Sequence, residues 1–361
     1  PGTPGEAGVA SPGVQFATPP AALDEELDAD HDDDAPLRFR KVEDVTGAAS
    51  TPGYAARALW SEQLFAVSAE EPSSLAHAEQ DPCWRKAMEE ELRAIEENRT
   101  WTLTELPPGR RAIGLKWVFK VKKDEHGVVV RHKARLVVKG YAQRQGIDYD
   151  EVFAPVAHLE VVRLLLALAA QEGWQVHHMD VKTTFLNGDL QEEVYVKQAP
   201  GFSQPGQEHK VYLLHKALYG LHQAPRAWNQ KLDEKLGVLG FIKCPSEHAI
   251  YCRGDGAEKL VVGVYVDDLI ITGCSSIIIQ NFKSQMSDVF KMSDLGVLSY
   301  YLGIEVKQDE LGITISQERY ANKILDQSGF ADCNTCEVPM QTKLKLNRKS
   351  DSGCVDTTEY R

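Results

Sequence analysis

The sequence contains no apolar run of membrane-spanning length. The leucine- and alanine-rich stretch at residues 164–170 is too short and is flanked by charge, whereas a spanning helix needs about 20 apolar residues. The seven cysteines are odd in number and follow no framework spacing, which argues against a disulfide-rich secreted protein and favours a reducing compartment. An initiator methionine and a signal peptide are also lacking, so we interpret the chain as an excised piece of a longer product.

An excess of positive charge is lacking too, since the 361-residue chain has a net charge of −13. The imbalance is local: residues 1–80 hold 15 acidic and 4 basic side chains, and the rest of the chain holds 38 acidic and 36 basic ones. The leader is rich in Pro, Gly, Ala and acidic residues, a composition that buries too little apolar surface to fold. We therefore predict that residues 1–70 form a disordered acidic linker.

Two adjacent aspartates, Asp267 and Asp268, interrupt an otherwise apolar run over residues 260–272. Two like charges among strand-forming residues cost stability through repulsion and desolvation, so a fold that keeps them is expected to place a cation beside them. Asp180 stands near the end of another predicted strand, 87 residues before Asp267, and neighbouring strands of one sheet would bring the three carboxylates together. Hard oxygen ligands favour Mg²⁺, and such a site suits phosphoryl or nucleotidyl transfer by two metal ions about 4 Å apart.

The segments around these acids resemble the reverse transcriptase of copia-type LTR retrotransposons. The resemblance starts from YVDD at residues 265–268, preceded by DVKTTFLNGDL at 180–190. Further similar segments follow in family order across roughly residues 70–361, which a chance match to a short motif would not do. They are WRKAMEEEL (84–92), TWTL (100–103), KWVFKVK (116–122), KARLVVKG (133–140), DYDEVFAPV (148–156), ALYGLHQAPRAW (217–228) and YLGIEV (301–306).

The resemblance implies an α+β right-hand polymerase fold, with a reverse transcriptase domain over residues 71–361. Fingers and palm would occupy residues 81–306, and a partial thumb or connection would occupy residues 307–361. In the family, the region that corresponds to residues 1–70 joins integrase to polymerase.

Local patterns predict several elements of this fold. Asp81 and Pro82 suit an N-cap and a first helical turn, and residues 116–138 are typical of a hairpin. Further helices are expected near residues 159–171, near 277–289 and from about 315 onward. The helix at 159–171 is apolar on nearly all sides, which predicts that it is buried.

The resemblance also implies roles for the acids. Asp180, Asp267 and Asp268 would be catalytic and would hold two Mg²⁺ ions, for which Mn²⁺ can substitute. The backbone carbonyl of Val181 would join them as a metal ligand. Asp267 would be the direct ligand of the pair, and Asp268 the supporting one.

Residues after Asp180 would bind the nucleotide. Backbone amides near Thr183 and Thr184 would meet the triphosphate, although relatives commonly carry Ala at the position of Thr184, so its hydroxyl is either tolerated or weakens binding. Phe185 stands where the family keeps an aromatic gate that excludes a ribose 2′-hydroxyl. The alternative is an ordinary core phenylalanine.

The predicted hairpin at 116–138 concentrates Lys and Arg beside Trp117 and Phe119, a surface suited to phosphates. For most of its lysines a solvated charged face is an equal alternative. Arg135 matches the fingers arginine that lies over the triphosphate in reverse transcriptases, and Lys133 is a weaker candidate for the lysine that joins it.

Tyr219, Gly220 and Gln223 are candidates for the floor beneath the dNTP and the template strand, since Gly220 permits close approach of the backbone to a ligand. Nearby Arg226 and Trp228 either belong to this floor or fix the start of the following helix, and the sequence leaves both alternatives open.

The segment at 301–306 resembles the hairpin that grips the primer 3′ end, with Leu302 and Gly303 at the contact. Lys291 falls where polymerases often keep a general acid for the leaving pyrophosphate, but a surface lysine is the favoured interpretation.

The resulting expectation is an RNA-directed DNA polymerase without RNase H, integrase or protease segments. Its partners would be an RNA or DNA template with primer, dNTPs and other segments of the Pol polyprotein, with no membrane; its location would be intracellular, in cytoplasmic virus-like particles and the nucleus. Two alternatives remain: an inactive remnant that only binds nucleic acid, and a polymerase that makes RNA, against which Phe185 argues.

Overall fold

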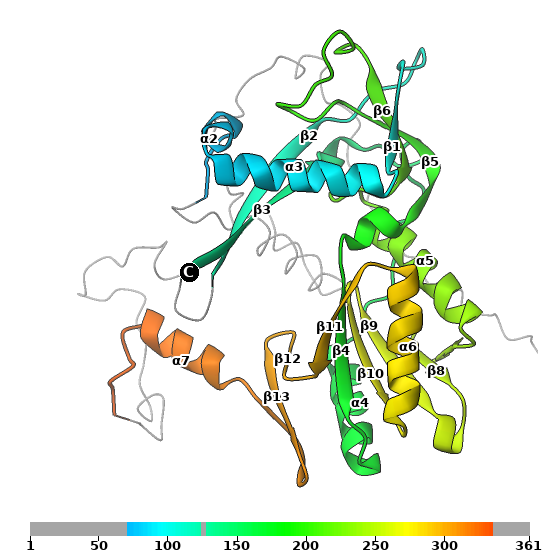
Figure 1. Ribbon diagram of the computed structural model, residues 1–361, viewed down its shortest axis with the longest axis vertical. Coiled ribbons are helices and arrows are strands. Elements are labelled where there is room, and N and C mark those ends of the chain that lie inside the picture. The colour runs from blue at the N-terminus through cyan, green and yellow to red at the C-terminus, as the bar shows by residue number, and fades with distance from the viewer. Residues whose placement is uncertain (1–70, 124–127, 335–361) are drawn as a thin grey trace, which may run out of the picture.

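The computed structural model describes residues 71–123 and 128–334. The predicted linker at 1–70, the hairpin turn at 124–127 and residues 335–361 lie outside the described residues. Helices mix with sheets whose named strands pair antiparallel, which confirms the α+β class. Figure 1 shows an upper part around α3 and the β2–β3 hairpin and a lower part around a larger sheet. Within the described residues, no helix combines the length and apolar character needed to cross a membrane.

The larger sheet has six strands in the order β11–β4–β10–β9–β8–β7. The apolar run around the paired acids forms its central hairpin, β9–β10, and the strand that carries Asp180 is the next neighbour, β4. Burial on both faces explains why β9 is apolar almost throughout. The strands are β4 (Val176–Val181), β7 (Ile242–Lys243), β8 (Ile250–Arg253), β9 (Leu260–Tyr265), β10 (Asp268–Gly273) and β11 (Met292–Val297).

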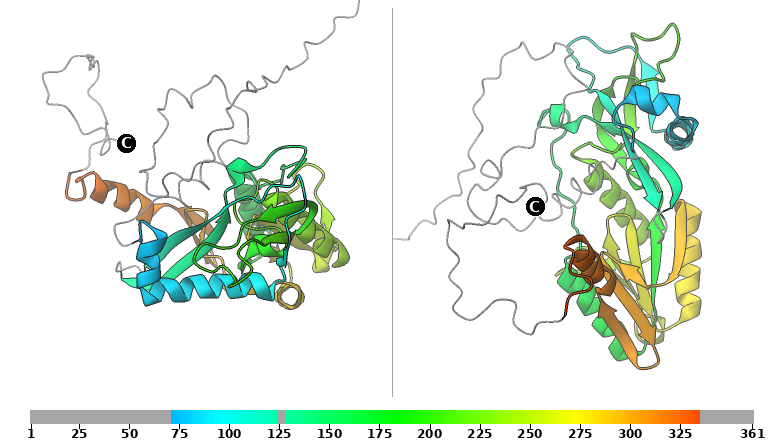
Figure 2. Two further views of the ribbon diagram at one scale, coloured as in Figure 1. Left: turned by 90° about the horizontal axis from the view of Figure 1, so that it is seen from above. Right: turned by 90° about the vertical axis from the view of Figure 1, so that its left-hand side faces the viewer.

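Side chains along these strands alternate between two faces. Leu269 packs in one apolar cluster with Phe282 of α6 (Ser276–Val289), whereas Ile270 packs in another with Leu165 of α4 (Leu159–Glu172). The right view of Figure 2 shows the sheet between α6 and α4. Asp268 is two residues before Ile270, so it lies on the face that α4 covers further along the strands.

Helix α4 is less buried than its sequence predicts. Val162, Leu165 and Ala169 are buried, but Leu164 is 70% exposed. The expectation of burial on all sides is therefore wrong, because α4 covers one face of the sheet and leaves its own opposite side outward. Its C-terminus follows the prediction, since Gly173 adopts φ 68° as the C-cap.

The upper part is built on α3 (Pro82–Glu97), which packs on the hairpin of β2 (Leu115–Lys123) and β3 (Val129–Val138). The predicted N-cap is present: the Asp81 carboxylate accepts a hydrogen bond from the Cys83 amide at 2.7 Å. The other elements between residues 71 and 238 are α2 (Leu75–Gln80), β1 (Trp101–Thr104), η2 (Gly140–Ala142), η3 (Thr184–Asn187), β5 (Asp189–Val196), β6 (Val211–Lys216) and α5 (Ala224–Val238).

The last described segment is a small sheet followed by a helix. Strands β12 (Tyr300–Tyr301), β13 (Ile304–Asp309) and β14 (Gly312–Ser316) precede α7 (Glu318–Gln327). The helix expected from about residue 315 begins later, because residues up to Ser316 still pair with β13.

Candidate active site

Strand register places two of the three predicted catalytic carboxylates opposite each other. Asp268 at the start of β10 pairs with Asp180 on β4, and cross-strand partners have Cβ atoms about 5 Å apart on one face. Asp267 lies in the β9–β10 turn, where its carbonyl accepts a hydrogen bond from the Val181 amide at 2.9 Å. The structure therefore brings Asp180, Asp267 and Asp268 to one end of the sheet.

The turn that carries Asp267 is conformationally costly. Val266 has φ 56°, a left-handed conformation that β-branched residues rarely adopt. Its carbonyl accepts a hydrogen bond from the indole of buried Trp228 at 2.6 Å, which supports a structural role for Trp228. Among the described residues, three of the four non-glycine residues with positive φ are Val266, Thr183 and Leu302. All three lie in turns that carry predicted site residues, where such strain tends to be retained for function.

Burial and like charge disfavour the ionised forms of Asp180 and Asp267. Burial, followed by the neighbouring Asp268 carboxylate, raises the pKa of Asp267 to about 6. The same two causes raise the pKa of Asp180. Carboxylates whose pKa values are raised in this way would gain stability from a nearby cation.

The donor chemistry of this site fits a hard cation such as Mg²⁺, which prefers carboxylate and carbonyl oxygens. In residues 71–123 and 128–334, no group of three or more His, Cys, Asp and Glu side chains lies in a position to hold an ion. The Val181 carbonyl accepts a hydrogen bond from the Thr184 hydroxyl at 2.8 Å and has a second lone pair.

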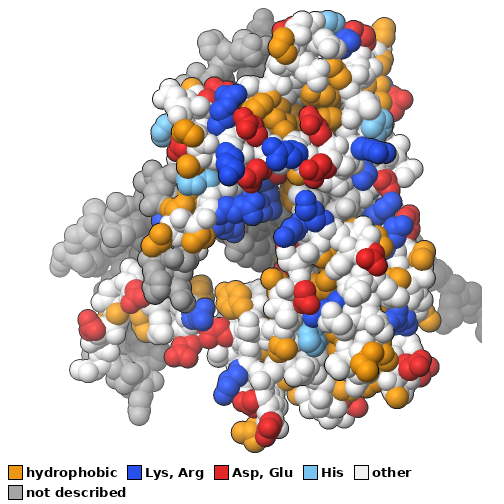
Figure 3. Space-filling view, viewed as in Figure 1, with side chains coloured by type: hydrophobic (Ala, Val, Ile, Leu, Met, Phe, Trp, Pro, Cys, Tyr) orange, Lys and Arg blue, Asp and Glu red, His pale blue; other side chains and the backbone are white. Residues whose placement is uncertain are grey.

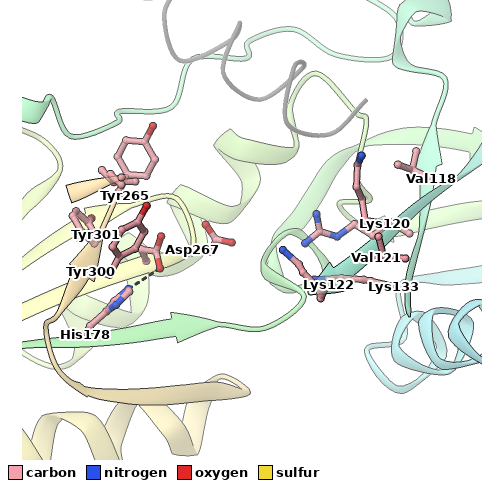
Figure 4. A pocket seen from close by; sticks show the side chains of 14 residues that line it. Val118, Lys120, Val121, Lys122, Lys133, His178, Tyr265, Asp267, Tyr300 and Tyr301 are labelled. Carbon is pink, nitrogen blue, oxygen red and sulfur yellow. Dashed lines mark hydrogen bonds and ion pairs between the residues drawn. The ribbon is translucent and has the colours of Figure 1, made fainter. Parts of the chain in front are cut away.

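A cleft of about 760 Å³ lies between the acidic end of the sheet and the β2–β3 hairpin. Figure 4 shows Lys120, Lys122 and Lys133 across this cleft from Asp267, and Figure 3 shows Lys and Arg side chains gathered where the upper part faces the lower part. Acid on one wall and base on the other suit a strongly anionic ligand bound together with a cation. The lining residues are Val118, Lys120, Val121, Lys122, Lys133, Arg135, His178, Tyr265, Asp267, Asp268, Tyr300, Tyr301, Leu302 and Gly303.

Arg135 on the basic wall is supported by aromatic rings. Its guanidinium carbon lies 4.5 Å from the ring centroid of buried Tyr219, a cation–π contact. The Tyr219 ring packs against Phe185, with centroids 4.9 Å apart. Phe185 is 5% exposed, which favours the core alternative and leaves its role as a gate a prediction.

Lys133 and Lys120 on the same wall differ in their surroundings. Burial, followed by Arg135, lowers the pKa of Lys133 to about 8. A phosphate beside this lysine would favour its protonated form and raise that pKa again. Lys120 forms an ion pair with the Glu71 carboxylate at 3.0 Å. The structure thus places both Arg135 and Lys133 in the cleft, and their binding to the triphosphate stays a prediction.

Gly220 and Gln223 do not line the cleft. Gly220 has φ 92°, and a Cβ atom there would lie 2.2 Å from the Val138 carbonyl. The close backbone approach that the glycine indicates is therefore to strand β3 of this chain. Gln223 is 2% exposed; its side chain donates to the Asp148 carbonyl at 2.8 Å and accepts from Gln143 at 2.9 Å.

The residues of η3 lie directly behind the acidic wall. Thr183 adopts φ 49°, and Thr184 is buried with its hydroxyl on the Val181 carbonyl. The Thr184 side chain therefore points into the protein, which favours the alternative in which its hydroxyl is tolerated.

Leu302 and Gly303 form the turn between β12 and β13 and line the cleft beside Tyr300 and Tyr301. Their φ angles are 49° and 83°. The structure thus brings the predicted primer contact to the cleft that holds Asp267.

Two residues flanking the site have surface ion pairs. Lys291 lies 3.8 Å from Glu97, with both side chains exposed, which supports the interpretation as a surface lysine. Arg226 pairs with Glu151 at 2.6 Å, which ties the start of α5 to the preceding loop.

His178 is a site residue that sequence reasoning missed. It lines the cleft, and its Nε2 atom lies 2.7 Å from Oδ1 of Asp268. A usable signal was present, because His178 precedes Asp180 by two residues on a predicted strand and so shares its face.

Comparisons with known proteins identify the family of this chain. The reverse transcriptase (RNA-dependent DNA polymerase) family matches residues 98–342, and the chain belongs to this family.

The chain is also similar to known Pol polyproteins, which confirms the copia-type resemblance. It is 39% identical over 296 residues to the retrovirus-related Pol polyprotein from transposon TNT 1-94 of Nicotiana tabacum, covering 80% of this chain and 22% of the relative. It is 38% identical over 292 residues to that from transposon RE1 of Arabidopsis thaliana, covering 81% and 20%. It is 24% identical over 301 residues to the Transposon Ty1-DR4 Gag-Pol polyprotein of Saccharomyces cerevisiae, covering 76% and 17%. The chain therefore spans about a fifth of the length of these relatives.

Proposed function

We propose that this chain is an RNA-directed DNA polymerase that extends a primer 3′-hydroxyl with dNTPs. The primer oxygen attacks the α-phosphorus in line, a new P–O bond forms, and the bond to the β-phosphate oxygen breaks to release pyrophosphate. Family membership supports the reaction class, and the geometry of the cleft supports the assignment of residues.

One observation carries the proposal: Asp180 and Asp268 pair across adjacent strands, and Asp267 follows in the connecting turn. Asp267 and Asp268 line a cleft whose other wall holds Lys133 and Arg135, and Asp180 lies opposite Asp268 on the neighbouring strand. A ligand that carries a triphosphate has complementary groups on both sides.

The acids would hold the cations, with Asp180, Asp267 and the Val181 carbonyl as direct ligands and Asp268 in support. When bound, two Mg²⁺ ions, or Mn²⁺ in their place, supply charge that activates the attacking oxygen and steadies the leaving one. The raised pKa values of Asp180 and Asp267 support this assignment, since both carboxylates would gain stability from a nearby cation.

On the opposite wall, Arg135 and Lys133 would bind the triphosphate. The planar guanidinium of Arg135 is fixed over Tyr219, so it is pre-oriented for two parallel bonds to phosphate oxygens. Backbone amides at Thr183 and Thr184 would meet the phosphates from the side of β4. Phe185 would exclude a ribose 2′-hydroxyl, with its ring held in place by Tyr219.

The hairpin β2–β3 with α3 would act as fingers, the six-stranded sheet with α4 and α6 as palm, and the segment from residue 307 as a partial thumb or connection. Leu302 and Gly303 would contact the primer. Template, primer and dNTPs would be the substrates, and other segments of a Pol polyprotein the partners. Such a protein would act in virus-like particles in the cytoplasm and in the nucleus.

The test is Mg²⁺-dependent extension of a DNA primer on an RNA template, with Asp267→Asn as the matched variant. We expect extension by the parent and its loss in the variant, because asparagine keeps the shape of the ligand and removes its charge. Template-primer binding, measured by fluorescence anisotropy, is expected to remain in both proteins.

A folded parent that binds template-primer and never extends it would instead identify an inactive remnant that only binds nucleic acid. Equal extension by the parent and by Asp267→Asn would contradict the assigned metal site.

A further inference from the structure

The histidine beside the paired acids is placed to control one of them. His178 on β4 bonds Asp268 Oδ1 through Nε2 at 2.7 Å, with side-chain exposures of 11% and 26%. An ionised carboxylate can only accept, so Nε2 carries the proton in this contact. One oxygen of Asp268 is thereby fixed, which sets the direction of the other.

The same imidazole touches the β12–β13 hairpin. The His178 and Tyr301 rings meet edge to face, with centroids 5.5 Å apart at an angle of 85°. Tyr301 is 2% exposed, and its hydroxyl has no hydrogen-bond partner among the described residues. Figure 4 shows His178 and Tyr301 on the side of the cleft that holds Asp267.

Tyr301 directly precedes Leu302 and Gly303 in the chain. A displacement of the His178 ring would therefore act on two things at once: the orientation of the Asp268 carboxylate and the packing of the strand that leads into the turn of Leu302.

We propose that His178 is a positioning residue that orients Asp268 for cation binding and couples it to the β12–β13 hairpin at the primer contact. The inference rests on the proposed function and deepens it, because it concerns the same site. His178 itself touches neither substrate nor cation. Its contribution passes through the Nε2 hydrogen bond on one side and through ring packing on the other.

The size of the effect follows from the kind of contact. Hydrogen bonds that orient a metal-binding side chain typically change metal affinity or activity by about 10–100-fold when removed. Without the Nε2–H group, Asp268 can rotate freely, and repulsion from Asp180 favours rotation away from the site.

The experiment compares three variants by two measurements. His178→Leu removes the donor, and His178→Gln keeps an N–H donor at a similar distance along the side chain. His209→Leu is the matched control, since His209 also contacts a carboxylate, that of Glu105, at 3.2 Å, but on an exposed surface away from the cleft. The first measurement is Mn²⁺ binding to the protein without substrates, followed by the electron paramagnetic resonance signal of free Mn²⁺. The second is steady-state primer extension, with separate KM values for template-primer and dNTP.

We expect His178→Leu to weaken Mn²⁺ binding about tenfold and to raise the KM for template-primer more than that for dNTP. His178→Gln should keep most of the Mn²⁺ affinity, and His209→Leu should match the parent. A purely structural histidine would give a lower melting temperature in both His178 variants with no selective change in Mn²⁺ binding, which would overturn the inference.

The outcomes separate this inference from the proposed function. A parent that binds Mn²⁺ and extends primers, with a His178→Leu variant that binds Mn²⁺ equally well, overturns the role of His178 alone. A parent that neither binds Mn²⁺ nor extends primers overturns the metal site and the inference together.

Discussion

The two walls of the cleft are positioned by different means. On the acidic wall, Asp180 and Asp268 are fixed by strand register, and the Asp267 turn is held by backbone hydrogen bonds and by Trp228. On the basic wall, Lys133 and Arg135 are long side chains on a two-stranded ribbon, oriented by neighbours such as Tyr219.

The walls also differ in strain and charge. The acidic side of the cleft has two residues with positive φ, Thr183 and Val266. It also has a carboxyl group with a raised pKa, that of Asp267. The described residues of β2 and β3 contain no residue with positive φ. In the proposed function, the carboxylates would define where a cation binds, and the cationic side chains, which are held by packing against their neighbours, would bind its ligand.

The largest expected effect is on the pH dependence of the free energy of unfolding, measured in EDTA so that no divalent cation is bound. The pKa of Asp267 is raised from 3.8 to about 6, so the folded state binds this proton more readily than the unfolded state. Its destabilising effect is therefore full above pH 6 and is relieved as pH falls from 6 towards 4. At 1.36 kcal/mol for each pKa unit, the relief is at most about 3 kcal/mol.

Urea unfolding at several pH values across that range checks the prediction in the parent and in Asp267→Asn. The variant cannot titrate at this position, so its stability should exceed that of the parent above pH 6 and converge with it on acidification. Parallel pH profiles for the two proteins would show that the acidic wall is not strained by this charge.

The basic wall is tested by Arg135→Lys. The substitution keeps the charge and loses the planar fork and its contact with Tyr219, so we expect the KM for dNTP to rise about tenfold. Arg131→Lys is the control, because Arg131 lies on the same strand with its exposed side chain paired to Glu90. If both variants raise the KM equally, the ring of Tyr219 does not orient the guanidinium.

The smallest effect concerns backbone strain at Thr183. Thr183→Gly removes a β-branched residue from a left-handed conformation and should raise the free energy of unfolding by about 1 kcal/mol, after allowance for the flexibility of glycine. Thr314→Gly on the exposed strand β14 should lower it, since glycine weakens strands. Differential scanning calorimetry of both variants gives the comparison, and a loss of stability at both sites would mean that the acidic wall stores no strain there.

Local elements were predictable because their causes are local. The cap at Asp81, the C-cap at Gly173 and the ribbon β2–β3 follow from neighbours within a few residues. The exposure of Leu164 was not predictable, because an apolar helix surface does not reveal how much of it another element covers.

The candidate site was predictable in its acids and less so in its surroundings. The sequence indicated that Asp180, Asp267 and Asp268 converge, and the structure brings them together. Gly220 indicated a close backbone approach, and the structure shows one, but the approaching group is the Val138 carbonyl and not a ligand. Burial of Gln223 depends on loop contacts 75 to 80 residues away, beyond the reach of any local pattern.

The sequence by itself determined the chemistry that is available: three carboxylates near strand ends, a basic ribbon and glycines where the backbone turns or approaches closely. Residue type and short-range spacing carry that information, because charge and backbone preference are properties of single residues and their neighbours. Only the tertiary structure decided that Asp268 faces Asp180, that Tyr219 supports Arg135 and that His178 links Asp268 to Tyr301. These contacts join distant segments, and they are set by the register and packing that bury both faces of the sheet.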